Sequence, residues 1–491
     1  MRLWERYKET IRANWHLGVT CFGGPAVQFQ TFHRRFVEDL GWIDEPMYQQ
    51  IFCLSQALPG SASVKMLLCI NAIRNGIGAG FLAFFILPGA VGMYALAVGI
   101  GHVQSTLPPP AYALLSGLNA ATVGVIALAA VKLAERAISD RMTRFLVYFG
   151  GVLGMLYYPL LMVIAGIVTY VWDTNYLQGQ YVIARRSLKR LVSRIRRKSS
   201  DIEKAQDLPS GKSSKRTSDT DKPLPELPKK SLRKQKLTQM APKPLPIPRS
   251  KFALPKYVEE ETEQDIPAMS WPLGSLILVM FGLTFVLFTT LHIVMPKLQR
   301  TFDLFSSLYL AGTIIFGGGP VVIPLLRDYI VSPGWVSPRD FLLGVAVIQA
   351  FPGPNFNFVV YLGSLAMAKT SNPSFVGAII AFIAMYIPGL FIVVGFMGLW
   401  RVMSNKKWFL AILRGINAAA VGLVFTAVYK LWQMGYLTAA VQEGGPLGTD
   451  PWLVFITATA YVSGAWFGFN PPTAILLGGI LGIVRYGVLD A

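Results

Sequence analysis

The sequence has few charged residues, few cysteines and few histidines for its length. Only 14% of its 491 residues are Asp, Glu, Lys or Arg, whereas 53% are hydrophobic. A soluble domain carries about 25% charged residues, so this composition excludes an ordinary soluble protein. Apolar runs long enough to cross a bilayer core of about 30 Å recur along the chain. The clear ones are residues 77–103, 111–134, 273–295, 374–400 and 409–432. The sequence therefore predicts an all-α polytopic membrane protein.

The three cysteines and four histidines are too scattered for a disulfide framework or a metal site. No CxxC pair occurs, so Cys21, Cys53 and Cys69 are expected to be small packing residues. No Ser/His/Asp, Cys/His or paired-carboxylate arrangement stands out in the predicted spans. The chain is therefore not expected to be an enzyme, and the sequence predicts no cofactor and no metal.

Much of the net charge of +19 lies in one hydrophilic segment, residues 176–266. This segment holds 22 Lys and Arg against 11 Asp and Glu, with many Pro and Ser. Such a composition cannot bury enough apolar surface to fold, which predicts a disordered cytosolic linker. Residues 181–198 have the pattern of a basic helix that lies on anionic lipid. Cytosolic flanking charge explains the basic balance better than nucleic-acid binding does.

A long pattern of residues occurs twice, in the same order. Phe22-Gly23-Gly24-Pro25 is matched by Phe316-Gly317-Gly318-Gly319-Pro320, and Gln56-Ala57-Leu58-Pro59-Gly60 by Gln349-Ala350-Phe351-Pro352-Gly353. The other matched pairs are Arg34 with Arg327, Trp42 with Trp335, Pro88-Gly89 with Pro388-Gly389, and Asn119 with Asn417. A run of this length is not a chance match, so the chain is predicted to be a fused tandem repeat.

The predicted division has three parts. Residues 1–175 form the first repeat and residues 176–266 form the linker. Residues 267–491 contain an extra membrane helix (273–295) and then the second repeat. Residues 1–13 are charged and amphipathic, without the pattern of a cleavable signal peptide, and are expected to lie at the cytosolic membrane surface.

The charges of matched loops predict that the repeats have inverted topologies. Residues 104–110 carry no charge, whereas the matched loop of repeat two holds Arg401, Lys406 and Lys407. The next loop reverses this pattern, because it is basic in repeat one (Lys132, Arg136, Arg141 and Arg144 against Glu135 and Asp140) but holds only Glu443 and Asp450 in repeat two. Cytosolic loops carry the excess of Lys and Arg, so matched loops lie on opposite sides. The N-terminus and the linker are then cytosolic, and the plasma membrane is the favoured location.

Gly-Gly-Pro and Pro-Gly motifs predict broken or re-entrant helices in both repeats. Proline removes a backbone donor and glycine permits unusual turns. A broken helix at membrane depth is tolerated only where its backbone lines a cavity, and a half-helix N-terminus favours an anion. Inverted repeats with broken helices are typical of secondary transporters. The candidate backbone positions for anion binding are Gly23, Gly24, Pro25, Pro59, Gly60, Ser61, Gly318, Gly319, Pro320, Pro352 and Gly353.

Polar side chains beside these breaks are further candidate ligands. Arg34 and Arg327 match between the repeats, and a guanidinium binds a tetrahedral oxyanion through paired N–H groups. They could equally be interfacial anchors. Gln56 and Gln349 can donate amide N–H groups without adding charge, or can form hydrogen bonds between helices.

Three further positions are less symmetric or less specific. Lys65 occurs only in repeat one, with Asn355 and Asn357 at the facing positions of repeat two. An ionisable residue inside a membrane segment predicts a functional site, although snorkelling to the surface remains open. For Asn119 and Asn417 a helix–helix hydrogen bond is favoured over substrate contact. No carboxylate stands in the middle of a span, so the coupling ion cannot be read from the sequence.

These motifs resemble the chromate transporter family in its long two-domain form. The resemblance rests on Phe22–Pro25, Phe32-His33-Arg34-Arg35-Phe36-Val37, Trp42, Gln56–Gly60, Phe316–Pro320 and Gln349–Pro354. It implies transport of chromate, with sulfate as the competing oxyanion, together with a coupling proton and chromate resistance in bacterial members. Two residues depart from the family pattern, because Ser61 replaces an expected proline and Lys65 stands where glutamine is usual. The long basic linker suggests a eukaryotic, fungal chain.

The leading expectation is a secondary transporter that moves chromate, and also sulfate, by alternating access. The anion would lie between the repeats, and Arg34→Ala and Arg327→Ala would each abolish transport without preventing membrane insertion. Transport of another inorganic or organic anion remains open, as does a scaffold or sensor that acts through the linker. The expected partners are an oxyanion, membrane lipid and a coupling proton, with no nucleic acid. A homodimer is also open, although fused repeats can be complete as a monomer.

Overall fold

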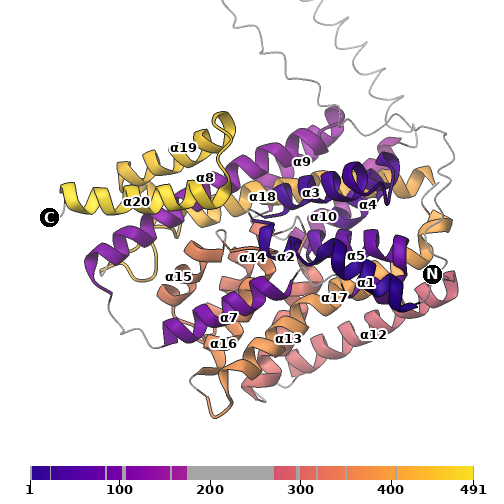
Figure 1. Cartoon of the computed structure of the whole chain (residues 1–491), viewed down its shortest axis with the longest axis horizontal. Helices are drawn as coiled ribbons and strands as arrows, with labels where there is room; N and C mark the ends of the chain where they lie inside the picture. The colour runs from indigo at the N-terminus through magenta and orange to yellow at the C-terminus, as the bar shows by residue number, and fades with distance from the viewer. Residues whose placement is uncertain are drawn as a thin grey trace, which may run out of the picture. The chain divides into compact units, whose positions relative to one another are not determined.

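The computed structural model contains almost only helices (Figure 1). It describes residues 3–173 and 270–489, except positions 23, 83–85, 102–106, 155–157, 295–298, 317–318, 349–350, 369, 404–405 and 439. Within these residues the β-structure is limited to one isolated bridge between Tyr436 and Gly445. This confirms the predicted all-α class. The predicted linker, 176–266, lies outside the described residues.

The helices of the first half form a series that is interrupted around residues 21–24, 58–61 and 81–86. They are α1 (Leu3–Asn14), α2 (Leu17–Thr20), α3 (Pro25–His33), the π-helix η1 (Arg34–Asp39), α4 (Glu45–Ala57), α5 (Ala62–Asn75), α6 (Ile77–Gly80), α7 (Leu87–Gly101), α8 (Pro109–Ala137), α9 (Arg141–Leu153) and α10 (Tyr158–Asp173). The last two are short helices that follow each other directly at the end of this half.

The second half begins with a helix that has no counterpart in the first and then repeats the same order. Its helices are α12 (Trp271–Val294), α13 (Arg300–Ile314), α14 (Gly319–Leu326), the π-helix η2 (Arg327–Val331), α15 (Pro338–Ile348), the 3-10 turn η3 (Asn355–Asn357), α16 (Phe358–Ala368), α17 (Ser374–Met403), α18 (Lys407–Trp432), the 3-10 turn η4 (Leu447–Thr449), α19 (Pro451–Trp466) and α20 (Pro471–Leu489). From α3 and α14 onward, the longer helices of the two halves correspond in order, and α6 and α7 together match the single helix α17.

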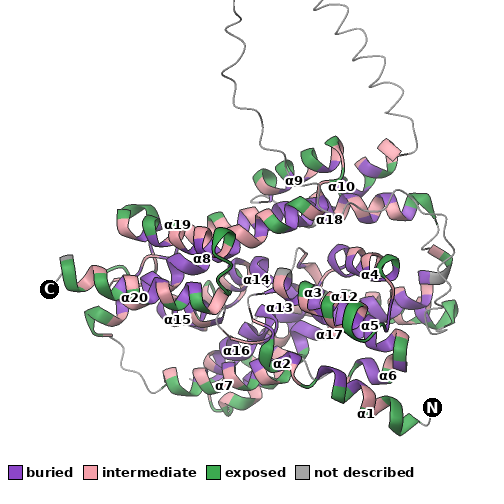
Figure 2. Ribbon diagram, turned by 45° about the horizontal axis from the view of Figure 1, so that its top comes forward, coloured by how far each residue is buried: buried purple, intermediate pink, exposed green. Residues whose placement is uncertain are grey.

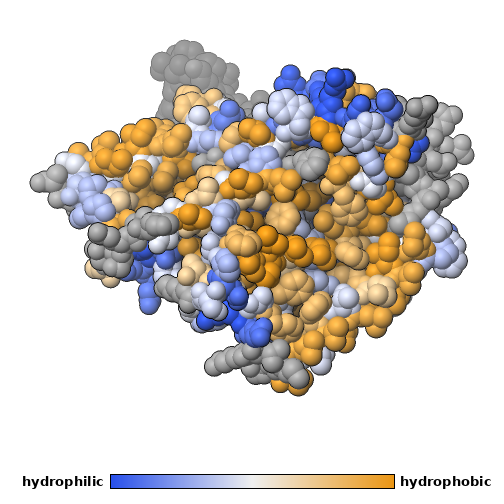
Figure 3. All heavy atoms as spheres, turned by 60° about the horizontal axis from the view of Figure 1, so that its bottom comes forward, coloured by the Kyte–Doolittle hydropathy of each residue, from blue (hydrophilic) through white to orange (hydrophobic). Residues whose placement is uncertain are grey.

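Five helices are long and apolar enough to cross a membrane. They lie in 109–137, 271–294, 374–400, 407–432 and 471–488. Hydrophobic side chains cover much of the face seen in Figure 3. The extra helix α12 is exposed along most of its length, as expected for a helix that faces lipid.

One predicted span differs from expectation. Residues 77–103 do not form one helix, because α6 ends at Gly80 and α7 begins at Leu87 with Pro88 in its first turn. Proline fits there because the first N–H groups of a helix have no intrahelical partner. The matched Pro388 instead lies inside the continuous helix α17, so this proline ends a helix in neither repeat.

The predicted interruptions at Pro-Gly occur in both repeats. The helix α4 ends at Ala57 and α5 begins at Ala62, while α15 ends at Ile348 and the next helical turn begins at Asn355. Gly60 and Gly353 adopt φ angles of 96° and 93°, a region that favours glycine. Figure 2 shows buried residues along α5, α14 and α16, so the helices beside the interruptions are surrounded by protein.

The equivalent helices α8 and α18 pack against each other in opposite directions. Near the start of α8, the Ser116 hydroxyl donates to the Leu437 carbonyl over 2.9 Å, just beyond the end of α18. At the other end of α8, Arg136 lines the same cavity as Asn417, which lies in the first half of α18. These two helices therefore run antiparallel to each other.

The terminal hairpins are exchanged between the repeats. Helix α9 of repeat one packs on α18, and α19 and α20 of repeat two pack on α8. Small residues allow this contact: a Cβ atom at Gly422 would lie 2.5 Å from the Val147 carbonyl oxygen, and one at the matched Gly124 would lie 2.3 Å from the Thr457 carbonyl oxygen. The reciprocal pattern is that of a two-fold arrangement of the repeats.

Candidate functional site

Backbone hydrogen bonds join the broken helices of the two repeats in both directions. The N–H of Gly60 donates to the Ile315 carbonyl, and the N–H of Gly353 donates to the Cys21 carbonyl, each over 2.8 Å. Ile315 and Cys21 each stand immediately before a glycine-rich break. The Pro-Gly break of one repeat is therefore fixed beside the Gly-Pro break of the other.

Each Pro-Gly break also packs against the matched proline-containing helix of the other repeat. A Cβ atom at Gly60 would lie 2.8 Å from the Cα atom of Gly389 in α17. A Cβ atom at Gly89 in α7 would lie 2.2 Å from the Pro352 carbonyl oxygen. Only glycine permits these approaches, and they bring all four Pro-Gly motifs to the contact between the repeats.

Unpaired amide groups lie beside this contact between the broken helices of the two repeats, here called the crossing. The side-chain nitrogens of Gln56 and Asn355 are buried and have no hydrogen-bond partner among the described residues. A Cβ atom at Gly319, the first residue of α14, would lie 3.0 Å from the Asn355 nitrogen. Asn355 therefore adds a free donor to a helix N-terminus, where the helix dipole also favours an anion.

Gln28, which the sequence analysis did not single out, holds one edge of the crossing. Its side-chain nitrogen donates to the Gly353 carbonyl over 2.7 Å, and it lies one turn into α3. The repeat alignment gives no signal for this residue, because the matched region of α14 is wholly apolar.

Lys65 lies at the same crossing. Its Nζ atom donates to the Pro59 carbonyl over 2.9 Å and to the Leu58 carbonyl, directly after the end of α4. The residue is only 1% exposed, so its amino group does not reach the surface in this structure. By spacing from the Pro-Gly motif, the residue at the same position in repeat two is Phe358.

The candidate asparagines have different surroundings. Asn357 donates to the Ile86 carbonyl over 3.0 Å and accepts from the Tyr386 hydroxyl over 2.9 Å, so it joins the two repeats. Asn119 donates to the Gly435 carbonyl over 3.3 Å, in the segment that follows α18, and not to another helix. Asn417 instead lines a cavity.

The other candidate positions fall into two groups. The structure brings five of them to the crossing as backbone of the breaks: Gly24, Pro25, Ser61, Pro320 and Pro352. Gly23, Gly318 and Gln349 lie outside the described residues.

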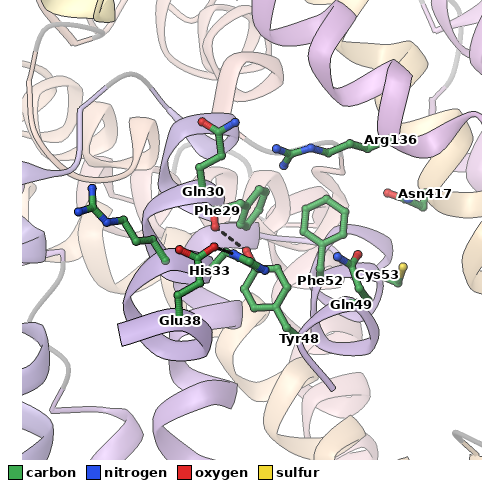
Figure 4. Close-up of a pocket in the computed structure, with 11 residues that line it drawn as sticks. Phe29, Gln30, His33, Glu38, Tyr48, Gln49, Phe52, Cys53, Arg136 and Asn417 are labelled. Carbon is green, nitrogen blue, oxygen red and sulfur yellow. Dashed lines mark hydrogen bonds and ion pairs between the residues drawn. The ribbon is translucent and has the colours of Figure 1, made fainter. Parts of the chain in front are cut away.

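A polar cavity of about 330 Å³ opens beside α3 and α4 (Figure 4). It is lined by Phe29, Gln30, His33, Arg34, Glu38, Tyr48, Gln49, Phe52, Cys53, Arg136 and Asn417. Arg136 projects from α8 toward the side of the cavity that carries Gln30. The cavity thus combines two guanidinium groups with one carboxylate, that of Glu38, and several uncharged polar groups, so hydrogen-bond donors and positive charge predominate in its lining.

The histidine in this cavity is held by two carboxylates. The Nδ1 and Nε2 atoms of His33 lie 3.1 Å and 2.5 Å from the carboxylates of Glu38 and Glu45. These contacts tie the end of α3 to η1 and to the first residue of α4. The two carboxylates are thereby engaged at the wall of the cavity, beside Arg34.

The two matched arginines do not lie in equivalent surroundings. Each begins a π-helical segment, a local distortion that is frequent at functional sites. Arg34 is exposed and lines the cavity. Arg327 donates to the Glu443 carbonyl over 3.0 Å and contacts the Met434 sulfur at 3.8 Å, so a loop covers it. The structure does not bring the two guanidinium groups to one site.

Sequence reasoning treated Arg136 only as a cytosolic loop charge. The predicted membrane span 111–134 ends before this residue, whereas α8 continues to Ala137 and carries Arg136 on its last turn. The described residues contain no group of three or more His, Cys, Asp and Glu side chains that could hold a metal ion. The site therefore offers hydrogen-bond donors and positive charge.

Comparison with known proteins agrees with these features. The family model "Chromate transporter" matches residues 9–171 and 302–483, which are the two repeats. The chain is 22% identical to a chromate transport protein of Cupriavidus metallidurans over 84% of this chain and 80% of that protein. It is also 22% identical to a chromate transport protein of Pseudomonas aeruginosa, over 95% of this chain and 89% of the relative.

A shorter relative matches about a third of the chain. The uncharacterized transporter YwrB of Bacillus subtilis is 26% identical over 172 residues, which are 32% of this chain and 84% of that protein. No solved structure matches the chain at a significant level. Because the family model matches well over half of the chain, the chain belongs to the chromate transporter family.

Proposed function

We propose that this protein is a secondary transporter that moves chromate, and also sulfate, across a membrane by alternating access. The observation that carries the proposal is the crossing of the two broken-helix pairs, where the buried amides of Gln56 and Asn355 have no partner among the described residues. Leaving such a donor unsatisfied costs about 1–3 kcal/mol. A bound oxyanion would satisfy both.

The chemistry of the crossing favours an anion over a cation. Its side chains and helix N-termini supply N–H groups, whereas a cation site would need several oxygen ligands. Chromate and sulfate are both tetrahedral dianions of similar shape, so the same set of donors accepts either. A carboxylate-containing organic anion of similar size remains the alternative substrate class.

The cavity beside α3 and α4 gives this site an entrance. Phe52 and Cys53 line it, and Cys53 lies five residues before Leu58, which corresponds to about 7.5 Å along a helix. Arg34 and Arg136 would attract an anion into the cavity and release it toward the neutral donors at the crossing. On this proposal Arg34 acts in the entrance rather than at the central site.

The proposed topology follows from the antiparallel packing of α8 and α18. Under the positive-inside rule, the basic end of α8 supports a cytosolic location for the cavity, and also for the N-terminus and the linker. The loop that covers Arg327 then closes the opposite side. Alternating access would require that loop to leave Arg327 while the cavity beside Arg34 closes. We place the protein in the plasma membrane, with residues 1–175 and 267–491 as its two transporting parts.

The direct test is flux of radiolabelled chromate and sulfate into proteoliposomes that contain the full chain, under pH gradients of either sign. Saturable chromate flux that excess sulfate suppresses is the expected result. The response to the gradient reports whether a proton is coupled. Absence of flux for both anions, with protein shown to be folded by size-exclusion chromatography, would contradict the proposed substrates.

A further inference from the structure

Lys65 is a buried basic group without a counter-ion. It is 1% exposed, and among the described residues it forms no ion pair. Its hydrogen-bond partners are the carbonyl oxygens of Leu58 and Pro59, both of which are uncharged. A charged group that is buried without an opposite charge is strongly unfavourable.

The titratable groups of the neighbouring elements do not supply that charge. Helix α5 packs against α1, α3, α4, α6 and α17. On α5 itself the thiol of Cys69, one turn along, is the group that interacts electrostatically with Lys65. Four titratable groups on the packed helices are engaged elsewhere: Glu9 of α1 with Arg74, His33 of α3 with Glu38 and Glu45, Tyr48 of α4 with the Phe29 carbonyl, and Tyr386 of α17 with Asn357. Of the others, Glu5 of α1 is exposed and Cys53 of α4 lines the cavity.

The two carbonyl partners can be satisfied by the uncharged form of the side chain. A neutral amine has two N–H groups and one lone pair. The carbonyls of Leu58 and Pro59 use both N–H groups, which leaves the lone pair available for a proton. Protonation adds a third N–H and a positive charge, and both are then available to an anion bound beside the Pro-Gly break.

We propose that Lys65 takes up one proton when an oxyanion binds and releases it when the anion leaves. This inference rests on the proposed function and assigns its coupling group. The lone pair of Nζ forms the new N–H bond, and the proton comes from the acid form of the buffer in the surrounding solution, where the conjugate base remains. The protonated amine becomes the counter-ion of the dianion, so neither charge is buried alone. Because Phe358 occupies the matched position, only one of the two breaks carries such a group.

Proton uptake on binding tests this directly. Sulfate is the probe, because it carries no titratable proton near neutral pH. Its binding to the purified full chain is measured by isothermal titration calorimetry at one pH in buffers of different ionisation enthalpy. The dependence of the heat on the buffer should give about one proton taken up for each sulfate bound.

The variant Lys65→Gln tests whether Lys65 is the group that takes up the proton when sulfate binds. Glutamine can still donate to a backbone carbonyl but does not titrate, so this variant should bind sulfate with no uptake through this position. Arg74→Gln removes a cation from the exposed end of the same helix and should retain the wild-type uptake. If Lys65→Gln does not fold, the wild-type pH dependence and the variant Lys65→Met provide the same comparison.

Each outcome decides a separate point. Sulfate binding by the wild type without proton uptake would overturn the inference and leave the proposed function intact. Equal uptake by the wild type and Lys65→Gln would also overturn it, because another group would then carry the proton. Failure of the folded wild type to bind either sulfate or chromate would overturn the proposed function and this inference together.

Discussion

The two repeats share a backbone design but differ in the side chains that fill it. Both have a π-helix that begins at an arginine and a Pro-Gly break that crosses to the other repeat. Around the cavity of repeat one stand Tyr48, Gln49 and Arg136. At the same spacing from the matched motifs, repeat two has Phe341, Leu342 and Met434.

This difference separates architecture from chemistry. The backbone contacts hold the repeats together equally from both sides, whereas the polar groups that could guide an anion are gathered on one side. In repeat two a loop that contains Glu443 and Met434 occupies the region in front of Arg327. Symmetric packing is therefore compatible with an entrance on one side only.

The largest effect is expected where the repeats touch most closely. Gly89→Ala would place a methyl group 2.2 Å from the Pro352 carbonyl oxygen. This should abolish transport and lower the free energy of unfolding by about 3 kcal/mol, at the upper end of overpacking costs. The matched Gly389→Ala approaches Gly60 at 3.2 Å and should cost less. Thermal melting in detergent measures both.

Gly99→Ala is the matched control, because it lies on the same helix and a Cβ atom there has no neighbour within 4 Å. Its free energy of unfolding should lie within about 0.5 kcal/mol of the wild-type value. Equal melting of the Gly89 and Gly99 variants would show that the two repeats are not in close contact at this point.

Alanine substitutions of the two matched arginines should have different effects on stability. Arg34→Ala should lower transport at least about 100-fold, the scale of a lost charge-assisted contact, while thermal stability is unchanged. Arg327→Ala should also lose transport, but it should in addition cost about 1.5–3 kcal/mol, because it removes a charged donor from the Glu443 carbonyl.

Hydrogen exchange distinguishes the two variants. Faster exchange in residues 436–446 of the Arg327 variant, and not of the Arg34 variant, is the expected pattern. The proposed roles, with Arg34 in the entrance and Arg327 holding the loop, would be contradicted if both variants lowered the free energy of unfolding by the same amount. They would also be contradicted if neither variant changed the exchange of that loop.

The unpaired amides should show opposite effects on binding and stability. Gln56→Leu and Asn355→Leu each remove a donor that has no partner in the described residues. Sulfate affinity should fall about 10-fold for each, the equivalent of about 1.4 kcal/mol, while thermal stability stays equal or rises. Asn357→Leu is the control, because that amide is fully engaged and its loss should reduce stability. A stability loss in all three variants would indicate that the amides are structural.

The smallest effect is expected at the exposed carboxylates of the cavity wall. Glu38→Gln weakens one of the two contacts of His33, and the Glu38 side chain is 59% exposed. Exposed ion pairs contribute only about 0–1 kcal/mol. Transport should therefore fall less than about 3-fold, and this small loss should decrease further in high salt. A loss as large as that of Arg34→Ala would mean that Glu38 belongs to the anion path.

The order of helices was predictable because the motifs that interrupt them are visible in the sequence. Gly60 and Gly353 end helices with the backbone angles that only glycine adopts freely, and the extra helix α12 was evident from its apolar run. In the apolar run 77–103 the break predicted at Pro88-Gly89 lies a few residues earlier, because α7 already begins at Leu87, and hydropathy alone does not show where a helix begins inside an apolar stretch.

The site was less predictable, because it depends on contacts between distant residues. Lys65 was selected for its charge, but its partners at Leu58 and Pro59 follow from the turn at Gly60. The different surroundings of Arg34 and Arg327 depend on a loop about a hundred residues further along the chain. Spacing can match two arginines, but it cannot show what covers one of them.

The reciprocal bonds from Gly60 to Ile315 and from Gly353 to Cys21 have a further consequence. They form a self-complementary, isologous contact of the kind that joins identical subunits of a symmetric dimer. Covalent fusion of the repeats then acts mainly by raising their effective concentration toward each other. Because the contact uses backbone atoms, side chains beside it can specialise independently, and one half can hold lysine where the other holds phenylalanine.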